Sequence, residues 1–426
     1  MKRNFFITVL ILAVTLSVYC SGQKDSSGAV KPVIRYAYQW TGDFDEQMKI
    51  YADAVEDEFI LELECTPGLD HKQKIQVEIA AGETPDIYQY WSYETNLRDM
   101  AENDIILNVN DYLAVTNKVS RDSFSAGAWS ATEVDGQNYG FPVSSFKGFF
   151  LANKALFDSY GLDLPETWSD LEQIAGVFRE NGIIPLSMGS IKGDPGHLFF
   201  SSLAFQAADG YADAQALAGT LNFDTNANHR AADAIADLIE WKIMPSDTIT
   251  NGGWGPQTAL YNSRKAAMIF SFPWKISDFN TEIVEESVLI PVPSIPGAEN
   301  SSAGFTVGGI SISNLINKKS FNDPAKQAAV VTLTDYLLSD KVYTDVALNG
   351  KGFPAKILEL PEGQDTLFDM VQNFTSEQDI YGIHEFFFPT LVTFDGYKSA
   401  CDELYAGAVT PDEFVEKIQK GLNRLQ

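Results

Sequence analysis

Aromatic and acidic residues lie directly after segments whose sequence predicts β-strands. Trp40 and Asp43 follow the first expected strand, and Tyr90 and Trp91 end the third. Aromatic rings pack against apolar C–H surfaces, and carboxylates accept hydrogen bonds from hydroxyl groups. A ligand that offers both an apolar face and hydroxyl groups would suit these side chains. Because ligands bind beyond the carboxyl ends of strands in open α/β sheets, these four residues are candidate ligand-binding residues.

Two more aromatic residues, Trp254 and Phe305, are candidates because of the glycines beside them. Trp254 lies in the run Asn-Gly-Gly-Trp-Gly, where a tryptophan has little local reason to be buried. Phe305 precedes a Gly-Gly pair at 308–309, at which a ligand could approach the backbone closely. For Tyr90 and Trp91 we expect only one contact, because successive side chains on a strand point to opposite faces.

The elements that would position these residues alternate between short strands and helices. Strands are expected over residues 33–38, 60–64 and 86–91. One helix is expected with Asp43 as its N-cap, and another over residues 72–81. This βαβ order predicts an α/β fold with parallel-rich sheets flanked by helices.

The second half of the chain repeats the alternation. Thr167 and Asp170 have the spacing of a helix capping box, and a strand is expected over residues 266–270. Pro324 and Pro411 are each expected in the first turn of a further helix, where a missing backbone N–H costs nothing. The chain therefore contains enough elements for two α/β lobes.

The amino-terminal segment has the pattern of a secretory signal. A positively charged start precedes an apolar run over residues 5–18, which is too short to span a membrane. Cys20 and a polar tether follow, as in a bacterial lipoprotein signal, although Tyr19 stands where a small residue is usual. We expect a signal peptide over residues 1–19, then a lipidated cysteine and flexible tether over 20–31. Ordinary secretion with cleavage nearby, or an uncleaved anchor, is the alternative.

The balance of charge limits the partners of the chain. Its 426 residues include 30 Lys and Arg and 58 Asp and Glu, which gives a net charge of −28. Such a field repels nucleic acid and anionic membranes, and it disfavours a highly anionic ligand unless a local basic pocket offsets it. The chain has no Cys-x-x-Cys, so we expect no metal and no cofactor, with Cys65 and Cys401 as unpaired thiols.

Six short motifs, in this order, resemble those of the bacterial extracellular solute-binding proteins of family 1, the group that includes maltose-binding protein. They lie at residues 82–86, 139–142, 153–157, 161–168, 267–274 and 352–354. Each motif alone is weak, whereas six in register over most of the chain are specific.

The resemblance implies a two-lobed periplasmic-binding-protein fold of type II, with the ligand held between the lobes. Three crossings of the chain between the lobes are expected near residues 143–148, 306–312 and 351–355. The expected amino-terminal lobe comprises residues 32–145 and 307–351. The expected carboxy-terminal lobe comprises residues 146–306 and 352–426.

The resemblance also implies a function. It identifies the chain as the extracytoplasmic receptor of an ABC importer, which binds a mono- or oligosaccharide without catalysis and delivers it to permease subunits by hinge closure. Trp274 aligns with a sugar-stacking tryptophan, and Asp194 and His197 align with a sugar-contacting segment. A monomer is expected, anchored by lipid in the periplasm or on the outer face of the membrane.

Two other classes of protein remain as alternatives. A secreted carbohydrate-active enzyme would need a pair of catalytic carboxylates, and nothing in the sequence singles out such a pair among the many acidic residues. Gly-x-Ser-x-Gly and Gly-x-Gly-x-x-Gly motifs are absent from the sequence. A sugar-binding surface or chemosensory lipoprotein would need the same pocket as an import receptor.

Overall fold

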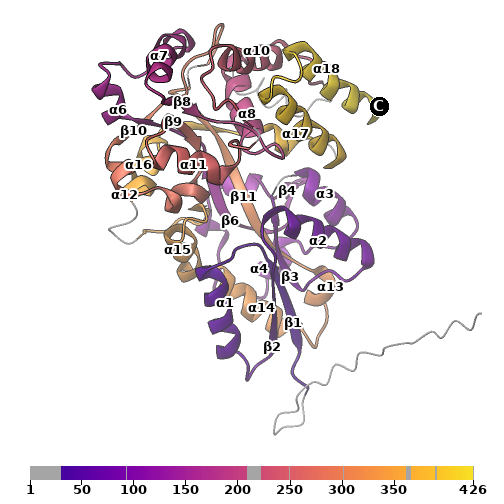
Figure 1. Ribbon diagram of the computed structural model, residues 1–426. Helices are drawn as coiled ribbons and strands as arrows, with labels where there is room; N and C mark the ends of the chain where they lie inside the picture. The colour runs from indigo at the N-terminus through magenta and orange to yellow at the C-terminus, as the bar shows by residue number, and fades with distance from the viewer. Residues whose placement is uncertain are drawn as a thin grey trace, which may run out of the picture.

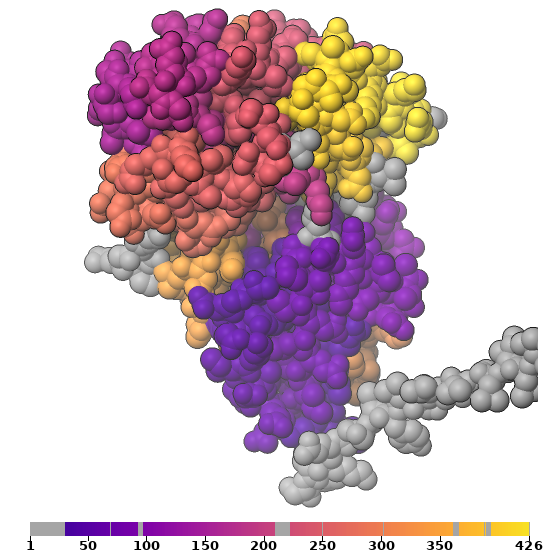
Figure 2. All heavy atoms as spheres, viewed as in Figure 1, coloured from indigo at the N-terminus to yellow at the C-terminus, as the bar shows by residue number. Residues whose placement is uncertain are grey.

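The computed structural model describes residues 30–425, apart from residues 93, 209–221, 249, 301, 361–365 and 389–390. The described chain forms two α/β lobes, which lie one above the other in Figures 1 and 2. Each lobe has its own sheet and its own buried core. The expected signal peptide and Cys20 lie outside the described residues. Within the described part of the chain, no helix is long and apolar enough to cross a membrane.

The first lobe is built on a mixed sheet. Its strands are β1 (Val33–Tyr38), β2 (Ile60–Cys65), β3 (Ile87–Trp91), β6 (Phe141–Lys147), β11 (Phe305–Ile316), β12 (Phe353–Pro354) and β13 (Asp379–Tyr381). They pair in the order β12-β6-β11-β3-β1-β2, with β13 beside β11. The first three strands run parallel, as the βαβ order predicts, whereas β11 runs antiparallel to β3 and β6.

Helices cover both faces of this sheet. They are α1 (Asp43–Ala54), α2 (Gly68–Ala81), α3 (Glu94–Glu102), α4 (Val109–Leu113), α5 (Ala126–Ser130), α13 (Lys318–Phe321), α14 (Gln327–Leu337) and α15 (Asp340–Leu348). Phe44 of α1 and Leu333 of α14 pack in one core cluster with Ile34 of β1. Ile75 of α2 packs on the opposite side, with Ala37 of the same strand. The alternation of side chains along β1 therefore supplies both cores. The short hairpin β4 (Glu133–Val134) and β5 (Gln137–Asn138) lies apart from the main sheet.

The second lobe contains a smaller sheet. Its strands are β7 (Phe149–Asn153), β8 (Ile184–Ser187), β9 (Ala266–Ser271) and β10 (Ser287–Ile290), in the order β10-β7-β9-β8. The helices around it are α6 (Lys154–Ser159), α7 (Trp168–Glu180), α8 (Gly196–Ala207), α10 (Asn226–Glu240), α11 (Trp254–Asn262), α12 (Thr281–Glu285), α16 (Thr366–Phe374), α17 (Leu391–Tyr405) and α18 (Pro411–Leu422). Every described residue of α8 is buried, because this helix lies inside the lobe between other elements.

Two long strands connect the lobes. In Figure 1, β6 and β11 run through the middle of the molecule from one lobe to the other. Val143 and Ile312 pack in the core of the first lobe, whereas Phe146 and Val307, on the same two strands, pack in the core of the second. A third connection passes through β12, and Leu358 beyond it still packs against the first core.

The glycine pair at 308–309 has a packing role at this crossing. A Cβ atom on Gly308 would lie 2.3 Å from the backbone oxygen of Phe146, and one on Gly309 would lie 2.8 Å from the ring of Phe386. Gly309 also has a φ of 149°. The sequence predicts a close approach of the ligand at these glycines. In the structure, the backbone of β6 and the ring of Phe386 already occupy the space next to them, which explains the glycines by packing.

Several local predictions agree with the structure and two are wrong. The first strand has the predicted bounds, and the capping box that begins α7 at Thr167 is present. Asp43 was expected as the N-cap of α1, but Gly42 holds that position and Asp43 is the first helical residue. The helix expected at Pro324 begins at Gln327, because residues 324–326 form a turn in which Ala325 N–H donates to the side chain of Asp323.

Candidate ligand-binding cleft

A cavity of about 440 Å³ lies between the lobes. Both lobes line it, and so do the strands β6 and β11 that join them. Its volume falls within the range of small-molecule binding sites, which favour domain interfaces. Six of the nine predicted ligand-binding residues line this cavity: Trp40, Trp91, Asp194, His197, Trp254 and Trp274.

Four tryptophans approach the cavity from opposite lobes. Trp40 follows β1 and Trp91 ends β3, both at the carboxyl ends of parallel strands of the first lobe. Trp254 is the first residue of α11, and Trp274 lies in a 3₁₀ turn that follows β9 in the second lobe. A ligand with apolar faces, bound in this cavity, would therefore contact aromatic rings from both lobes.

The ring of Trp274 is fixed by three other aromatic residues. It stacks on Phe272 with 4.8 Å between centroids and 3° between planes. The Trp254 ring is perpendicular to both members of this stack, at 5.9 Å from Phe272 and 5.6 Å from Trp274. Because Trp254 is almost equally distant from the two parallel rings, it lies beside the stack. Phe146 lies beside it in the same way, at 5.7 and 5.6 Å. The Trp274 face opposite Phe272 is therefore left open by all three neighbours.

Asp194 and His197 form a polar corner of the cavity. The Nε2 atom of His197 lies 3.0 Å from Oδ1 of Asp194, and the imidazole is almost fully buried while a third of the carboxylate side chain is exposed. Asp402 holds this loop by accepting hydrogen bonds from Ser190 Oγ and from the backbone N–H of Gly193. One carboxylate oxygen of Asp194 thus orients the imidazole, and the other is a potential acceptor for a ligand hydroxyl.

A cluster of charged residues that the sequence analysis missed lies at the same cavity. Glu385 and Lys398 of the second lobe line it, and Lys72 of the first lobe reaches Glu385 with 3.6 Å between Nζ and Oε1. Burial lowers the pKa of Lys72, the Glu385 carboxylate opposes that shift, and the Lys398 ammonium adds to it. Lys72 also lies over the Trp91 ring, at 5.3 Å from its centroid. This ion pair joins the two lobes across the cleft.

The other three predicted residues lie outside this cavity. Tyr90 is buried on the opposite face of β3, where its hydroxyl accepts a hydrogen bond from Gln76. As predicted from the alternation of side chains along a strand, only one residue of this pair lines the cavity, and it is Trp91. Phe305 is buried in the second core, stacked on Tyr381 at 4.5 Å, because strand β11 already begins at this residue. Asp43 lines a different cavity.

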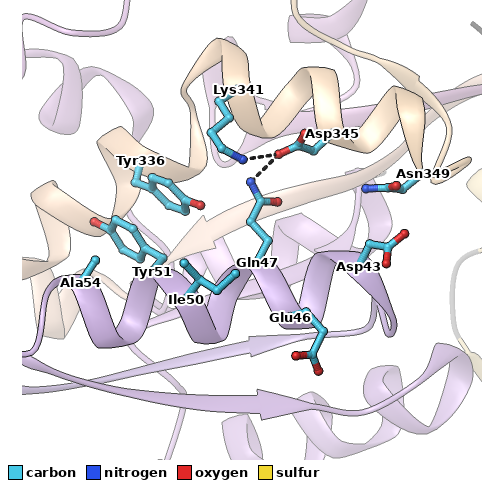
Figure 3. A pocket seen from close by; sticks show the side chains of 10 residues that line it. All are labelled: Asp43, Glu46, Gln47, Ile50, Tyr51, Ala54, Tyr336, Lys341, Asp345 and Asn349. Atoms are coloured by element: carbon cyan, nitrogen blue, oxygen red, sulfur yellow. Dashed lines mark hydrogen bonds and ion pairs between the residues drawn. The ribbon is translucent and has the colours of Figure 1, made fainter.

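That second cavity is an open groove of about 520 Å³ on the first lobe, between α1 and the α14–α15 region (Figure 3). Tyr51 and Tyr336 stack along it with 3.6 Å between centroids. Its polar side chains already bind one another: Gln47 donates to Asp345, which also accepts from Lys341 at 2.7 Å. The amide N–H of Gln47 and the ammonium of Lys341 are thus already bound to Asp345, whereas Gln47 Oε1 has no hydrogen-bond partner among the described residues.

Among the described residues, no group of three or more His, Cys, Asp or Glu side chains is arranged to hold a metal ion. The two described cysteines are free thiols, with Cys65 at the end of β2 and Cys401 buried in α17. The cleft therefore offers rings, carboxylates and ammonium groups, which suit non-covalent recognition of a polar molecule with apolar faces.

Comparison with known proteins places the chain in a family. A family model described as bacterial extracellular solute-binding protein matches residues 66–344. The melibiose/raffinose/stachyose-binding protein MelE of Bacillus subtilis (strain 168) is 27% identical over 206 residues, which cover 45% of this chain and 42% of that protein. The match therefore spans less than half the length of this relative.

Solved structures share the two-lobed fold. A chitin oligosaccharide binding protein aligns with a TM-score of 0.77 at 20% identity, over 92% of this chain and 98% of that one. A sugar transporter from Bacillus licheniformis in complex with stachyose aligns with a TM-score of 0.69 at 17% identity, over 92% and 100%. At these identities the likeness shows the fold, and it confirms the two-lobed fold that the motifs predicted.

Proposed function

The chain belongs to the bacterial extracellular solute-binding proteins, and from that premise we propose that it is a non-catalytic receptor for a mono- or oligosaccharide. The ligand binds in the interlobe cavity, between the tryptophans of the two lobes. The solute-binding relatives are named for melibiose, raffinose and stachyose and for chitin oligosaccharides, which supports a carbohydrate ligand. As a member of an extracellular family, the chain acts outside the cytoplasm.

The observation that carries the proposal is the placement of four tryptophans around one cavity, two from each lobe. Sugar rings present apolar C–H faces and a rim of hydroxyls, so a bound sugar would stack on the indoles while Asp194 and Glu385 accept hydrogen bonds from its rim. A tryptophan that only filled a core would be buried on all sides, whereas Trp91, Trp254 and Trp274 are each partly exposed.

We further propose that the receptor delivers its ligand to ABC permease subunits by closure of the lobes. The strands β6 and β11 run through both lobes and would bend in this motion. Closure would bring the two tryptophan pairs together on the ligand. The receptor is proposed to act as a monomer, held at the membrane by lipid on Cys20.

A ligand screen tests the proposal. The purified protein, without its signal peptide, is heated with a panel of mono- and oligosaccharides, and hits are titrated by calorimetry. A ligand at a hundredfold excess over its Kd stabilises the folded state by about 2.7 kcal/mol, which a thermal shift detects. We expect at least one sugar to raise the melting temperature and to be recovered uncleaved. A cleaved ligand would favour a carbohydrate-active enzyme, and a panel without any binding would contradict the proposal.

A further inference from the structure

Lys398 is a buried lysine at the ligand cavity. It lies on α17 of the second lobe, is 8% exposed and lines the interlobe cavity. Its alkyl chain is held tightly: a Cβ atom on Gly193 would lie 2.5 to 2.7 Å from three of its carbon atoms. Its ammonium lies over the Phe394 ring, 5.0 Å from the centroid. The ammonium is thus fixed in place next to the cavity.

Among the described residues, no carboxylate forms an ion pair with this ammonium. In the part of the chain that the structure describes, Lys398 takes part in no hydrogen bond and no ion pair through its side chain. Three carboxylates near the cavity are engaged elsewhere: Glu385 with Lys72 at 3.6 Å, Asp194 with His197 at 3.0 Å, and Asp402 with the loop that contains Gly193. Asp395, three residues before Lys398 on α17, is exposed on the surface and forms no ion pair with it. The Phe394 ring, a weak partner, lies next to the charge.

A buried charge without a partner is unfavourable, so proteins rarely keep one that nothing neutralises. Here a second positive charge, Lys72, is close enough for the two lysines to influence each other. Because Lys398 lines the interlobe cavity, a ligand bound there could bring a counterion to it. A sugar hydroxyl would accept a hydrogen bond from the ammonium but leave its charge in place, whereas an anionic group would do both.

We propose that the cleft takes an anionic carbohydrate, whose carboxylate, sulfate or phosphate group binds the ammonium of Lys398. The inference rests on the proposed function, because it assumes that the interlobe cavity is the sugar site. The tryptophans position the ring of the sugar, and Lys398 selects the charged substituent. Lys72 adds to the positive potential from the other lobe while its own pairing with Glu385 is retained.

Matched pairs of ligands test the inference on the purified protein. Glucuronic acid, glucose 6-sulfate and glucose 6-phosphate are each compared with glucose by calorimetry, and the di- and trisaccharides of galacturonic acid with those of galactose. We expect at least one anionic ligand to bind tenfold or more tightly than its neutral counterpart. The three monosaccharides distinguish a carboxylate from a sulfate or a phosphate as the preferred group.

Two variants assign the preference to the residue. Lys398→Met keeps the alkyl chain and removes the charge, so we expect the anionic ligand to bind no better than the neutral one. Lys417→Met removes a lysine of the same lobe that is paired with Glu403 on the surface, and it should keep the full preference. If Lys398→Met does not fold, Lys398→Gln replaces it, and circular dichroism checks the fold of each variant.

Each outcome decides the inference. Neutral sugars that bind as well as every anionic one would overturn it and leave the proposed function standing. A preference that survives in Lys398→Met would also overturn it, because the anion would then bind elsewhere. Absence of binding by the whole panel would contradict both this inference and the proposed function.

Discussion

Replacing Trp274 with alanine tests whether the cleft holds its ligand by aromatic stacking. Phe272 covers one face of the Trp274 ring at 4.8 Å, so a ligand has the other face on which to stack. Aromatic contacts contribute about 0.5–1.5 kcal/mol beyond burial, and burial itself adds about 25 cal/mol per Å² of apolar area. We expect binding to weaken by about 1–3 kcal/mol, which is about 5-fold to 140-fold, since 1.4 kcal/mol corresponds to a factor of ten.

The same substitution also affects stability, and the two effects have to be separated. Removing the ring uncovers one face of Phe272 and deletes the contacts with Trp254 and Phe146. Replacing a fully buried aromatic residue with alanine lowers the free energy of unfolding by about 3–5 kcal/mol. Because Trp274 is only partly buried, we expect a smaller loss and a folded protein at 25 °C. Denaturant unfolding measures the stability, and calorimetry at 25 °C measures the affinity.

Two further variants sharpen the assay. Trp274→Phe retains a ring over Phe272 and should lose less affinity than the alanine variant. Trp241→Ala removes an equally large and partly buried ring from the second lobe, at the end of α10 and outside the cavity, and should leave the affinity unchanged. An unchanged affinity in Trp274→Ala would refute the reasoning, because Trp274 would then be a structural residue only.

Three other predictions concern the amino terminus, the thiols and pH. Cys20→Ala should abolish incorporation of a palmitate analogue in cells, and equal labelling of both proteins would rule out lipidation at this residue. Cys65 and Cys401 should both be alkylated in the unfolded, unreduced protein, and a cross-linked peptide in the mass spectrum would contradict this. Burial lowers the pKa of His384 from 6.5 to about 3, so the folded state keeps it neutral. Between pH 6.5 and about 3, the unfolded state binds a proton at His384 and the folded state does not. The free energy of unfolding therefore decreases as the pH falls through this range, by up to about 1.4 kcal/mol per pH unit, and is unaffected by His384 above pH 6.5. The unfolding free energy of His384→Gln should therefore depend less on pH in this range, and equal slopes would show that the group does not titrate on unfolding.

Local sequence signals were enough to predict individual elements. The strand Val33–Tyr38 was predictable because its residues have a strong β preference and lie between a tether and a helix start. The capping box at Thr167 needs only a spacing of three residues. The start of α14 was not predictable from Pro324, because the carboxylate of Asp323 stabilises a turn that competes with the helix.

Some residues of the candidate site were likewise predictable from local sequence signals, and others were not. Trp40 and Trp91 end or follow parallel strands, so their position at the sheet edge follows from the order of elements. The position of Phe305 was not predicted, because no local signal marks the start of β11 at this residue. The pairing of β13 with β11 places the ring in the second core. Lys398 carries no local signal at all: it lies on a helix near the carboxyl terminus, and only tertiary packing brings α17 to the cleft.

The acidic composition of the chain and the single lysine proposed to bind the ligand act over different distances. The net charge of −28 is spread over the surface, where salt at physiological concentration screens interactions beyond about 8 Å. Lys398 is 8% exposed as a residue and lines the cavity, so little solvent separates it from a ligand there, and its field is much less screened. An anionic solute would thus meet weak repulsion outside the protein and a strong, local attraction inside it. For this reason the overall charge of a chain constrains the surfaces that it approaches more than the ligand that its cleft selects.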